Sequence, residues 1–125
     1  MQRFGRRDSF PVPPEPDRLG RAIVDRYLQN IRMVDALSAG LGFKYDYFWL
    51  PMPVTESDPP ALHAAVRVIE PLIGAANVDH LHDLTRLYGS NLRIDLCHVL
   101  PEGNRLIAGS VYDVIKNKFP AAAKQ

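Results

Sequence analysis

The amino-acid sequence predicts an α/β fold in which helices cover a short parallel sheet. Helical and extended patterns alternate along the chain, which is the order typical of layered α/β domains. A long amphipathic helical pattern comes first, and an aromatic-rich segment bounded by prolines follows it. The sequence offers only two short strands, and a parallel pair needs helices on both faces. We therefore interpret these elements as the trailing part of a larger sheet.

Prolines and apolar periodicity divide the chain into three regions. Residues 1–16 hold four of the eleven prolines and no apolar periodicity, so we predict an extended tail or linker. Residues 17–119 form the folded region, and residues 120–125 form a second tail. The first helix is predicted to begin at Asp17 and to end near Gly42. Its apolar positions are spaced by three or four residues: Leu19, Ile23, Tyr27, Ile31, Val34, Leu37 and Leu41.

The elements after the first helix are shorter. Residues 45–50 read as a buried strand, and a second helix is expected from Asp58, with Pro71 kinking or ending it. Residues 78–88 carry apolar side chains at helical spacing, whereas residues 91–96 alternate as a short extended segment does. The last helix is expected to start at Pro101, with Glu102 in its first turn. Its predicted apolar stripe consists of Ile107, Val111, Val114 and Ile115.

Composition limits the classes of function. The chain has 125 residues, of which 46% are hydrophobic and 23% charged, and its formal net charge of +1 argues against a nucleic-acid partner. Cys97 is the single cysteine, so no internal disulfide forms, and we expect neither a metal nor a cofactor. No secretory signal or membrane-spanning run is recognised, so the chain is expected to be cytoplasmic if it is complete.

One short segment carries a chemical signal. Asp95 stands three residues before His98, in a loop that leads into the last helix. One turn brings the carboxylate to the imidazole Nδ1, which fixes the tautomer and leaves Nε2 available as a general base. We expect a carboxylate oxygen within hydrogen-bonding distance of Nδ1 and an open space at Nε2. The alternative for two residues at this spacing is a capping contact or an exposed ion pair.

The pattern around this pair extends further. After Asp95 the chain reads Asp-x-x-His-x-x-Pro-Glu-Gly-Asn and continues into an apolar helix with Ala108. This string resembles the last conserved block of the GDSL-type (SGNH) serine hydrolases. Three earlier passages resemble the helix and strand that precede that block in some members: residues 27–32, 42–45 and 48–53. The resemblance covers about residues 20–118.

The resemblance implies a fold and an activity. Residues 17–119 would be the C-terminal portion of a three-layer α/β/α sandwich with a parallel sheet, incomplete in this chain. The family hydrolyses or transfers esters through a serine nucleophile, and the motif match assigns the general base to His98 and its orienting partner to Asp95. The expected substrate is a small-molecule, glycan or lipid ester, and no cofactor is implied.

The family's other blocks are missing. The chain lacks the Gly-Asp-Ser block of the nucleophile and the Gly-x-Asn-Asp block of the oxyanion hole, and Ser9 follows neither a glycine nor a strand. The isolated chain is therefore expected to be inactive and to self-associate through an exposed sheet edge. The competing hypothesis is a non-catalytic remnant or interaction module. A metal site at His80 and His82 is disfavoured, because residues two apart on a helix do not share a face.

Overall fold

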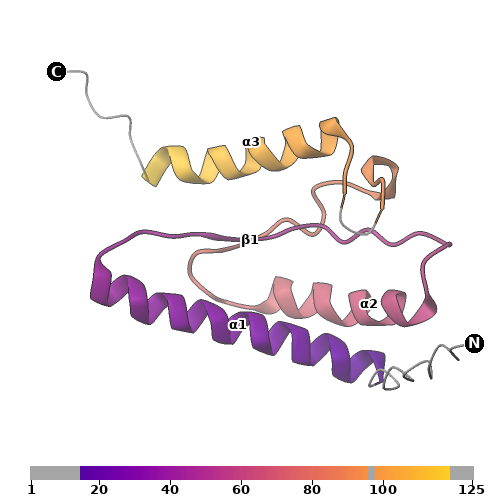
Figure 1. Ribbon diagram of the computed structural model, residues 1–125, viewed down its shortest axis with the longest axis horizontal. Helices are drawn as coiled ribbons and strands as arrows, with labels where there is room; N and C mark the ends of the chain where they lie inside the picture. The colour runs from indigo at the N-terminus through magenta and orange to yellow at the C-terminus, as the bar shows by residue number, and fades with distance from the viewer. Residues whose placement is uncertain (1–14, 96–97, 119–125) are drawn as a thin grey trace, which may run out of the picture.

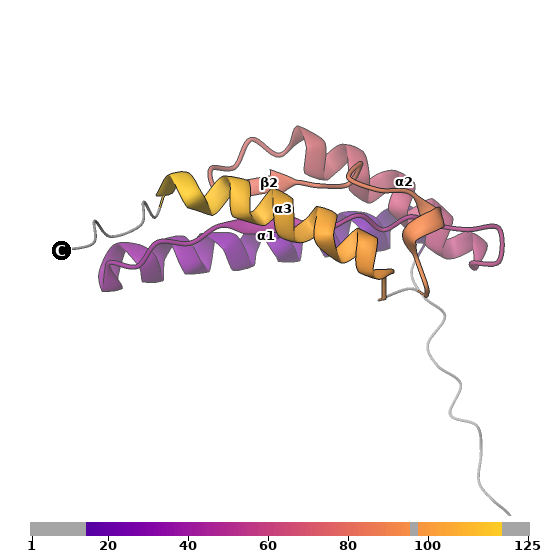
Figure 2. The same ribbon diagram turned by 90° about the horizontal axis from the view of Figure 1, so that it is seen from above.

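The strand pair lies between two helical layers. The computed structural model describes residues 15–95 and 98–118, and within them it contains three α-helices and a two-stranded parallel sheet. Figures 1 and 2 show α1 and α2 side by side on one face of the strands and α3 on the other. The prediction of a mixed helix-and-strand fold with a parallel sheet is therefore confirmed at that level.

The first helix, α1, spans Pro16–Leu41, so it begins one residue earlier than predicted. Gly42 ends it in the left-handed region at a φ of 71°, and its backbone N–H donates to the Ser38 carbonyl at 2.8 Å. This left-handed end is a common way to satisfy the last carbonyls of a helix, and glycine adopts it without a Cβ clash.

The second helix, α2, spans Pro60–Ala75 and packs against α1. Pro71 does not end it, contrary to one of the two outcomes predicted. An interior proline costs about 3 kcal/mol, because it lacks an N–H and crowds the preceding turn. Ile69 and Ile73 flank it and are almost fully buried, and burial of such a side chain contributes about 1.5–3 kcal/mol. The burial of these two side chains therefore offsets the free-energy cost of the proline. The buried hydrophobic core among the described residues consists of Val24, Ile31, Ala65, Val66, Ile69 and Ile73, and four of them, Val24, Ala65, Ile69 and Ile73, form one cluster between α1 and α2.

The two strands are β1, Tyr47–Trp49, and β2, Leu81–Asp83, and Phe48 is paired in register with His82. β1 confirms the strand predicted over residues 45–50. The helical interpretation of residues 78–88 is wrong. Backbone hydrogen bonds with β1 make part of this segment a strand. Tyr47 N–H donates to the His80 carbonyl at 2.7 Å, and Leu84 N–H donates to the Trp49 carbonyl at 2.9 Å. A short apolar run does not distinguish helix from strand by spacing alone.

The chain reaches the last helix through a tight loop. Ser90–Leu92 form one turn of 3-10 helix, and Arg93 makes an isolated antiparallel bridge with Val99, so the predicted extended segment is reduced to this bridge. Helix α3 spans Pro101–Lys118 and starts at the predicted proline. Its predicted stripe is only partly buried, since Ile107, Val111 and Val114 are half-buried and Ile115 is exposed.

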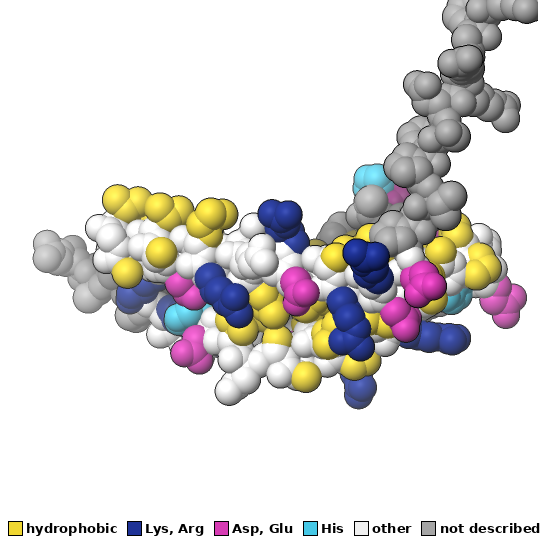
Figure 3. Space-filling model, turned by 90° about the horizontal axis from the view of Figure 1, so that it is seen from below, with side chains coloured by type: hydrophobic (Ala, Val, Ile, Leu, Met, Phe, Trp, Pro, Cys, Tyr) yellow, Lys and Arg dark blue, Asp and Glu magenta, His cyan; other side chains and the backbone are white. Residues whose placement is uncertain are grey.

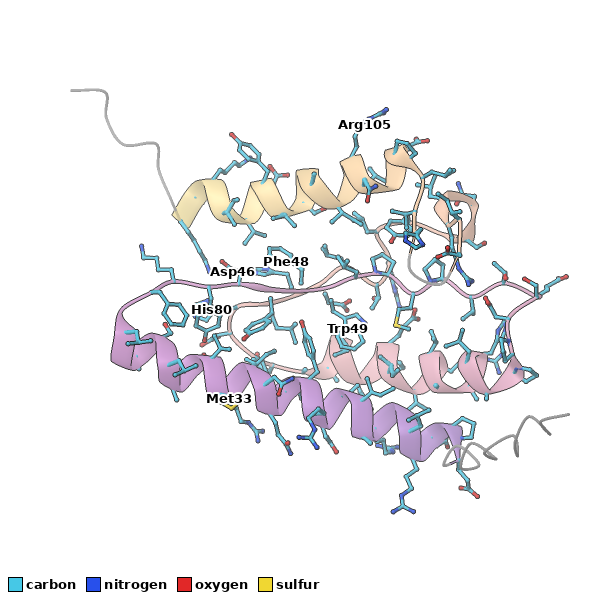
Figure 4. The ribbon with its side chains drawn as sticks, in the orientation of Figure 1. Met33, Asp46, Phe48, Trp49, His80 and Arg105 are labelled. Carbon is cyan, nitrogen blue, oxygen red and sulfur yellow. The ribbon has the colours of Figure 1, made fainter. Side chains whose placement is uncertain are left out.

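Several apolar side chains remain exposed on α1. Met33, Leu37 and Leu41 are 61%, 51% and 73% exposed, and we call them the α1 outer stripe. Met33 points away from the sheet (Figure 4), and the surrounding face mixes basic, acidic and hydrophobic side chains (Figure 3). None of the described helices combines the length and the apolar character needed to cross a bilayer.

Candidate functional site

The loop before α3 brings Asp95 and His98 together. His98 Nδ1 lies 2.8 Å from Asp95 Oδ1 and 2.7 Å from Oδ2. An ionised carboxylate only accepts hydrogen bonds, so Nδ1 carries the hydrogen and Nε2 is the unprotonated nitrogen of the neutral ring. Within residues 15–95 and 98–118, no hydrogen bond joins His98 Nε2 to another group. The geometric expectation for the pair is therefore confirmed, while its catalytic role stays a prediction.

The pair is open to solvent. The side chains of His98 and Asp95 are 72% and 56% exposed. An exposed ion pair contributes little to stability, so the pair by itself does not hold the loop in shape. Asp95 Oδ1 also accepts the backbone N–H of His98 at 2.9 Å, as in an Asx-type loop contact. The carboxylate thus orients both the ring and the backbone of His98.

Backbone hydrogen bonds close the loop on each side of the pair. Ile94 N–H donates to the His98 carbonyl at 2.8 Å, and Leu100 N–H donates to the Leu92 carbonyl at 2.8 Å. Gly103, in the first turn of α3, is buried, and a Cβ there would lie only 3.2 Å from Val99 Cβ. Because Gly103 has no Cβ, the first turn of α3 can pack closely against Val99 in the loop.

Arg93 holds the same loop in place through hydrogen bonds to Asp58, Asp95 and Pro53. Its Nη2 donates to Asp58 Oδ1 at 2.9 Å, its Nη1 donates to Asp58 Oδ2, and both side chains are only 9% exposed. Its Nε donates to the Asp95 carbonyl at 2.8 Å, and Nη1 also reaches the Pro53 carbonyl at 3.0 Å. The guanidinium thus connects the backbone of Asp95 to the segment that follows β1.

The hydrogen bonds of Asp58 set its charge state. The guanidinium of Arg93, followed by the backbone N–H of Thr55 at 2.7 Å, holds the pKa of the Asp58 carboxyl well below its usual range. The sequence pattern indicates only a helix start at Asp58 and no role for Arg93. No local spacing pattern reveals this pair, because the two residues are 35 positions apart.

A pocket of about 260 Å³ opens beside the pair. We call it the Leu62 pocket. Arg93, Asp95 and His98 form one wall. The other walls are mainly apolar and come from the segment after β1, from α2 and from the loop regions: Pro51, Met52, Leu62, Val66, Tyr88 and Val99. Partial burial raises the pKa of the Tyr88 phenol, so this hydroxyl stays neutral.

A second polar cluster lies at the opposite ends of the strands. Asp46, whose side chain is 4% exposed, accepts hydrogen bonds from Lys118 Nζ at 2.6 Å and His82 Nε2 at 2.8 Å. Burial raises the pKa of Asp46, but the hydrogen bonds from Lys118 and His82 outweigh it, so the net shift is downward. His80 also approaches, with Nδ1 4.0 Å from Asp46 Oδ1. Figure 4 shows Asp46 and His80 at this end of the molecule.

This cluster corrects the prediction that His80 and His82 lie on a helix. Because residues 81–83 form a strand, His82 points to the α3 side, where its ring stacks on Phe48 with centroids 4.9 Å apart. The Lys118 ammonium lies 2.6 Å from Asp46 Oδ1 and offsets the charge of this carboxylate. Among the described residues no group of three or more His, Cys, Asp or Glu side chains is arranged to hold a metal ion.

The nucleophile is not identified in the described part of the chain. No Ser or Thr hydroxyl among residues 15–95 and 98–118 is hydrogen-bonded to His98. Ser9 and Cys97, the two nucleophile candidates weighed from the sequence, lie outside the described residues. Comparisons with protein-family models, with curated proteins and with solved structures identified no match to this chain.

Proposed function

We propose that this chain is the C-terminal part of an SGNH-type serine hydrolase that acts on ester bonds. The observation that carries the proposal is the position of His98, whose Nδ1 is held 2.7 Å from an Asp95 oxygen, while no hydrogen bond joins its Nε2 to another group among the described residues. A histidine with a structural role usually has both nitrogens satisfied, whereas a general base keeps one nitrogen for the reacting hydroxyl.

In the proposed reaction, His98 Nε2 removes the proton of a serine hydroxyl as the oxygen attacks the ester carbonyl. The same nitrogen then returns the proton to the departing alcohol, and water releases the acyl group from the serine by the same two proton transfers. Asp95 keeps the ring in the productive tautomer and stabilises the imidazolium. The serine and the oxyanion donors belong to a polypeptide segment with the Gly-Asp-Ser and Gly-x-Asn-Asp blocks.

The sequence encoded directly upstream of this chain is the first test. An open reading frame with a strand, Gly-Asp-Ser and Gly-x-Asn-Asp would supply the missing segment, and its joint expression with this chain should give hydrolysis of a short-chain aryl ester. In that complex His98→Ala should lower kcat by at least about 10³-fold. His80→Ala is the matched control, because His80 lies at the opposite end of the strands, and it should leave kcat within about twofold. Equal activity of both variants would contradict the assignment.

The second candidate is a non-catalytic interaction module. The high exposure of His98 and Asp95 favours it, since a base in a working active site is usually enclosed when the site is complete. The exposed α1 outer stripe is consistent with a surface that binds a partner. An upstream frame without a Gly-Asp-Ser block, together with a joint complex that is unaffected by His98→Ala, would favour the module over the hydrolase.

A further inference from the structure

The Leu62 pocket lies directly against the proposed catalytic pair, and its chemistry narrows the substrate. His98 and Asp95 form part of one wall, so a group held in the pocket would lie beside the proposed catalytic pair. Two of the lining residues are buried in the fold: Val66 in α2 is 5% exposed, and Pro51 after β1 is buried. A preformed, concave, mainly apolar surface with a few polar groups at one side is the usual form of a small-molecule site.

The two charged side chains of that wall, Arg93 and Asp95, already have partners. The Arg93 guanidinium is committed to the Asp58 carboxylate and to the carbonyls of Pro53 and Asp95. The Asp95 carboxylate is committed to His98. A charged ligand group entering the pocket would therefore lose water without gaining an ion pair, and that transfer is costly.

The size of the pocket limits its occupant. An apolar cavity of roughly 150 Å³ holds one benzene molecule. The volume of about 260 Å³ therefore suits one substituted benzene ring or an aliphatic chain of comparable bulk, and it is too small for a long lipid chain in full. A sugar ring would fit by volume, but most of the lining residues, among them Leu62, Val66 and Val99, offer its hydroxyls no side-chain hydrogen bonds.

From these observations we infer that the Leu62 pocket binds an uncharged apolar group, a short acyl or alkyl chain or one aromatic ring, next to the ester on which His98 acts. The identification of that group as part of an ester rests on the proposed function. The binding itself does not, because it depends on the apolar walls and not on the proton transfers of His98. The substrate class is thereby narrowed from glycan or lipid esters to esters with a compact apolar group.

Binding can be measured without catalysis on the full chain. Trifluoromethylbenzene, which contains no bond for a hydrolase to cleave, is titrated and followed by its fluorine NMR signal. Saturable binding is expected, and benzoate, the same ring with a charge, should bind at least about tenfold more weakly. Leu62→Phe fills the pocket and should weaken binding of the neutral probe by about tenfold. Leu72→Phe is the matched control, because Leu72 is a half-buried residue of α2 outside this pocket. This variant should leave binding of the neutral probe unchanged.

Three results would overturn the inference: equal affinity for benzoate and the neutral probe, no effect of Leu62→Phe, or equal loss in both leucine variants. If Leu62→Phe does not fold, Leu62→Ala replaces it. This variant enlarges the pocket and should shift the preference toward n-butylbenzene, and an unchanged preference would count against the site. His98→Ala removes only part of one wall, so it should weaken probe binding less than Leu62→Phe does, while it abolishes ester hydrolysis in the complex. Failure of the pocket and failure of the proposed function are therefore distinguishable.

Discussion

The Arg93 guanidinium and the Asp58 carboxylate form a bidentate ion pair beneath the Asp95–His98 loop. Nη2 donates to Oδ1 at 2.9 Å, Nη1 donates to Oδ2, and each side chain is 9% exposed. A bidentate pair fixes both distance and orientation, which a single contact does not. Because Arg93 Nε also holds the Asp95 carbonyl at 2.8 Å, the ion pair determines where the Asp95–His98 loop lies relative to β1 and α2.

Asp58→Asn tests this anchor through its pH dependence. The folded-state pKa of Asp58 lies below its unfolded value of about 4, so its carboxylate stabilises the fold fully above that value. The stabilisation is lost as the pH falls from about 4 toward the folded pKa. We therefore expect Asp58→Asn to lower Tm by several degrees at pH 7 and by much less at pH 2.5, measured by circular dichroism. Glu56→Gln, an exposed neighbour, is the control. A Tm difference for Asp58→Asn that does not depend on pH would contradict this account.

Asp46→Ala should loosen the C-terminal end of α3. It removes a carboxylate that is 4% exposed and accepts from Lys118 Nζ at 2.6 Å and from His82 Nε2 at 2.8 Å. Loss of such a buried partner costs about 1–3 kcal/mol locally, so amide hydrogen exchange in the last turns of α3 should accelerate about 5- to 150-fold. Asp113→Ala removes an exposed pair with Lys116 and should change exchange little. Equal effects of the two variants would show that Asp46 does not hold α3.

The isolated chain should show no ester hydrolysis above buffer. His98 has an orienting partner, but the described residues place no hydroxyl in hydrogen-bonding contact with it, and a base without a nucleophile or oxyanion donors has little to act on. A p-nitrophenyl ester assay on the purified chain gives the measurement. Turnover that disappears in His98→Ala would contradict the expectation, and it would make Ser9→Ala and Cys97→Ser the next variants to assay.

The purified chain should self-associate or bind a hydrophobic dye. The described sheet has two strands and therefore an unpaired edge on each, and the α1 outer stripe adds exposed apolar surface. Leu37→Lys, which places a charge in that stripe, should reduce dye fluorescence and shift the elution volume toward the monomer. Ala39→Lys adds the same charge at an exposed position outside the stripe and should have less effect. A monodisperse wild-type chain with cooperative unfolding and no dye binding would contradict the prediction.

Much of the helical structure follows from local pattern. Apolar spacing of three or four residues predicted α1, because the period of an α-helix is a property of consecutive residues, and Pro101 predicted the start of α3. The aromatic run around Phe48 predicted β1 because it too is a pattern of consecutive residues. The contact between Asp95 and His98 was predictable too, since a separation of three residues is closed by one turn.

The amino-acid sequence by itself therefore determined the three helices, one strand and the Asp95–His98 pair, all of which depend on neighbours within a few positions. Only the tertiary structure decided that residues 81–83 are a strand, since their backbone groups are paired with β1. It also decided the partners of Asp58, 35 positions from Arg93, and of Asp46, 72 positions from Lys118. No periodicity connects such positions, because the distance between them is set by how the helices pack on the strands, and the Leu62 pocket exists for the same reason.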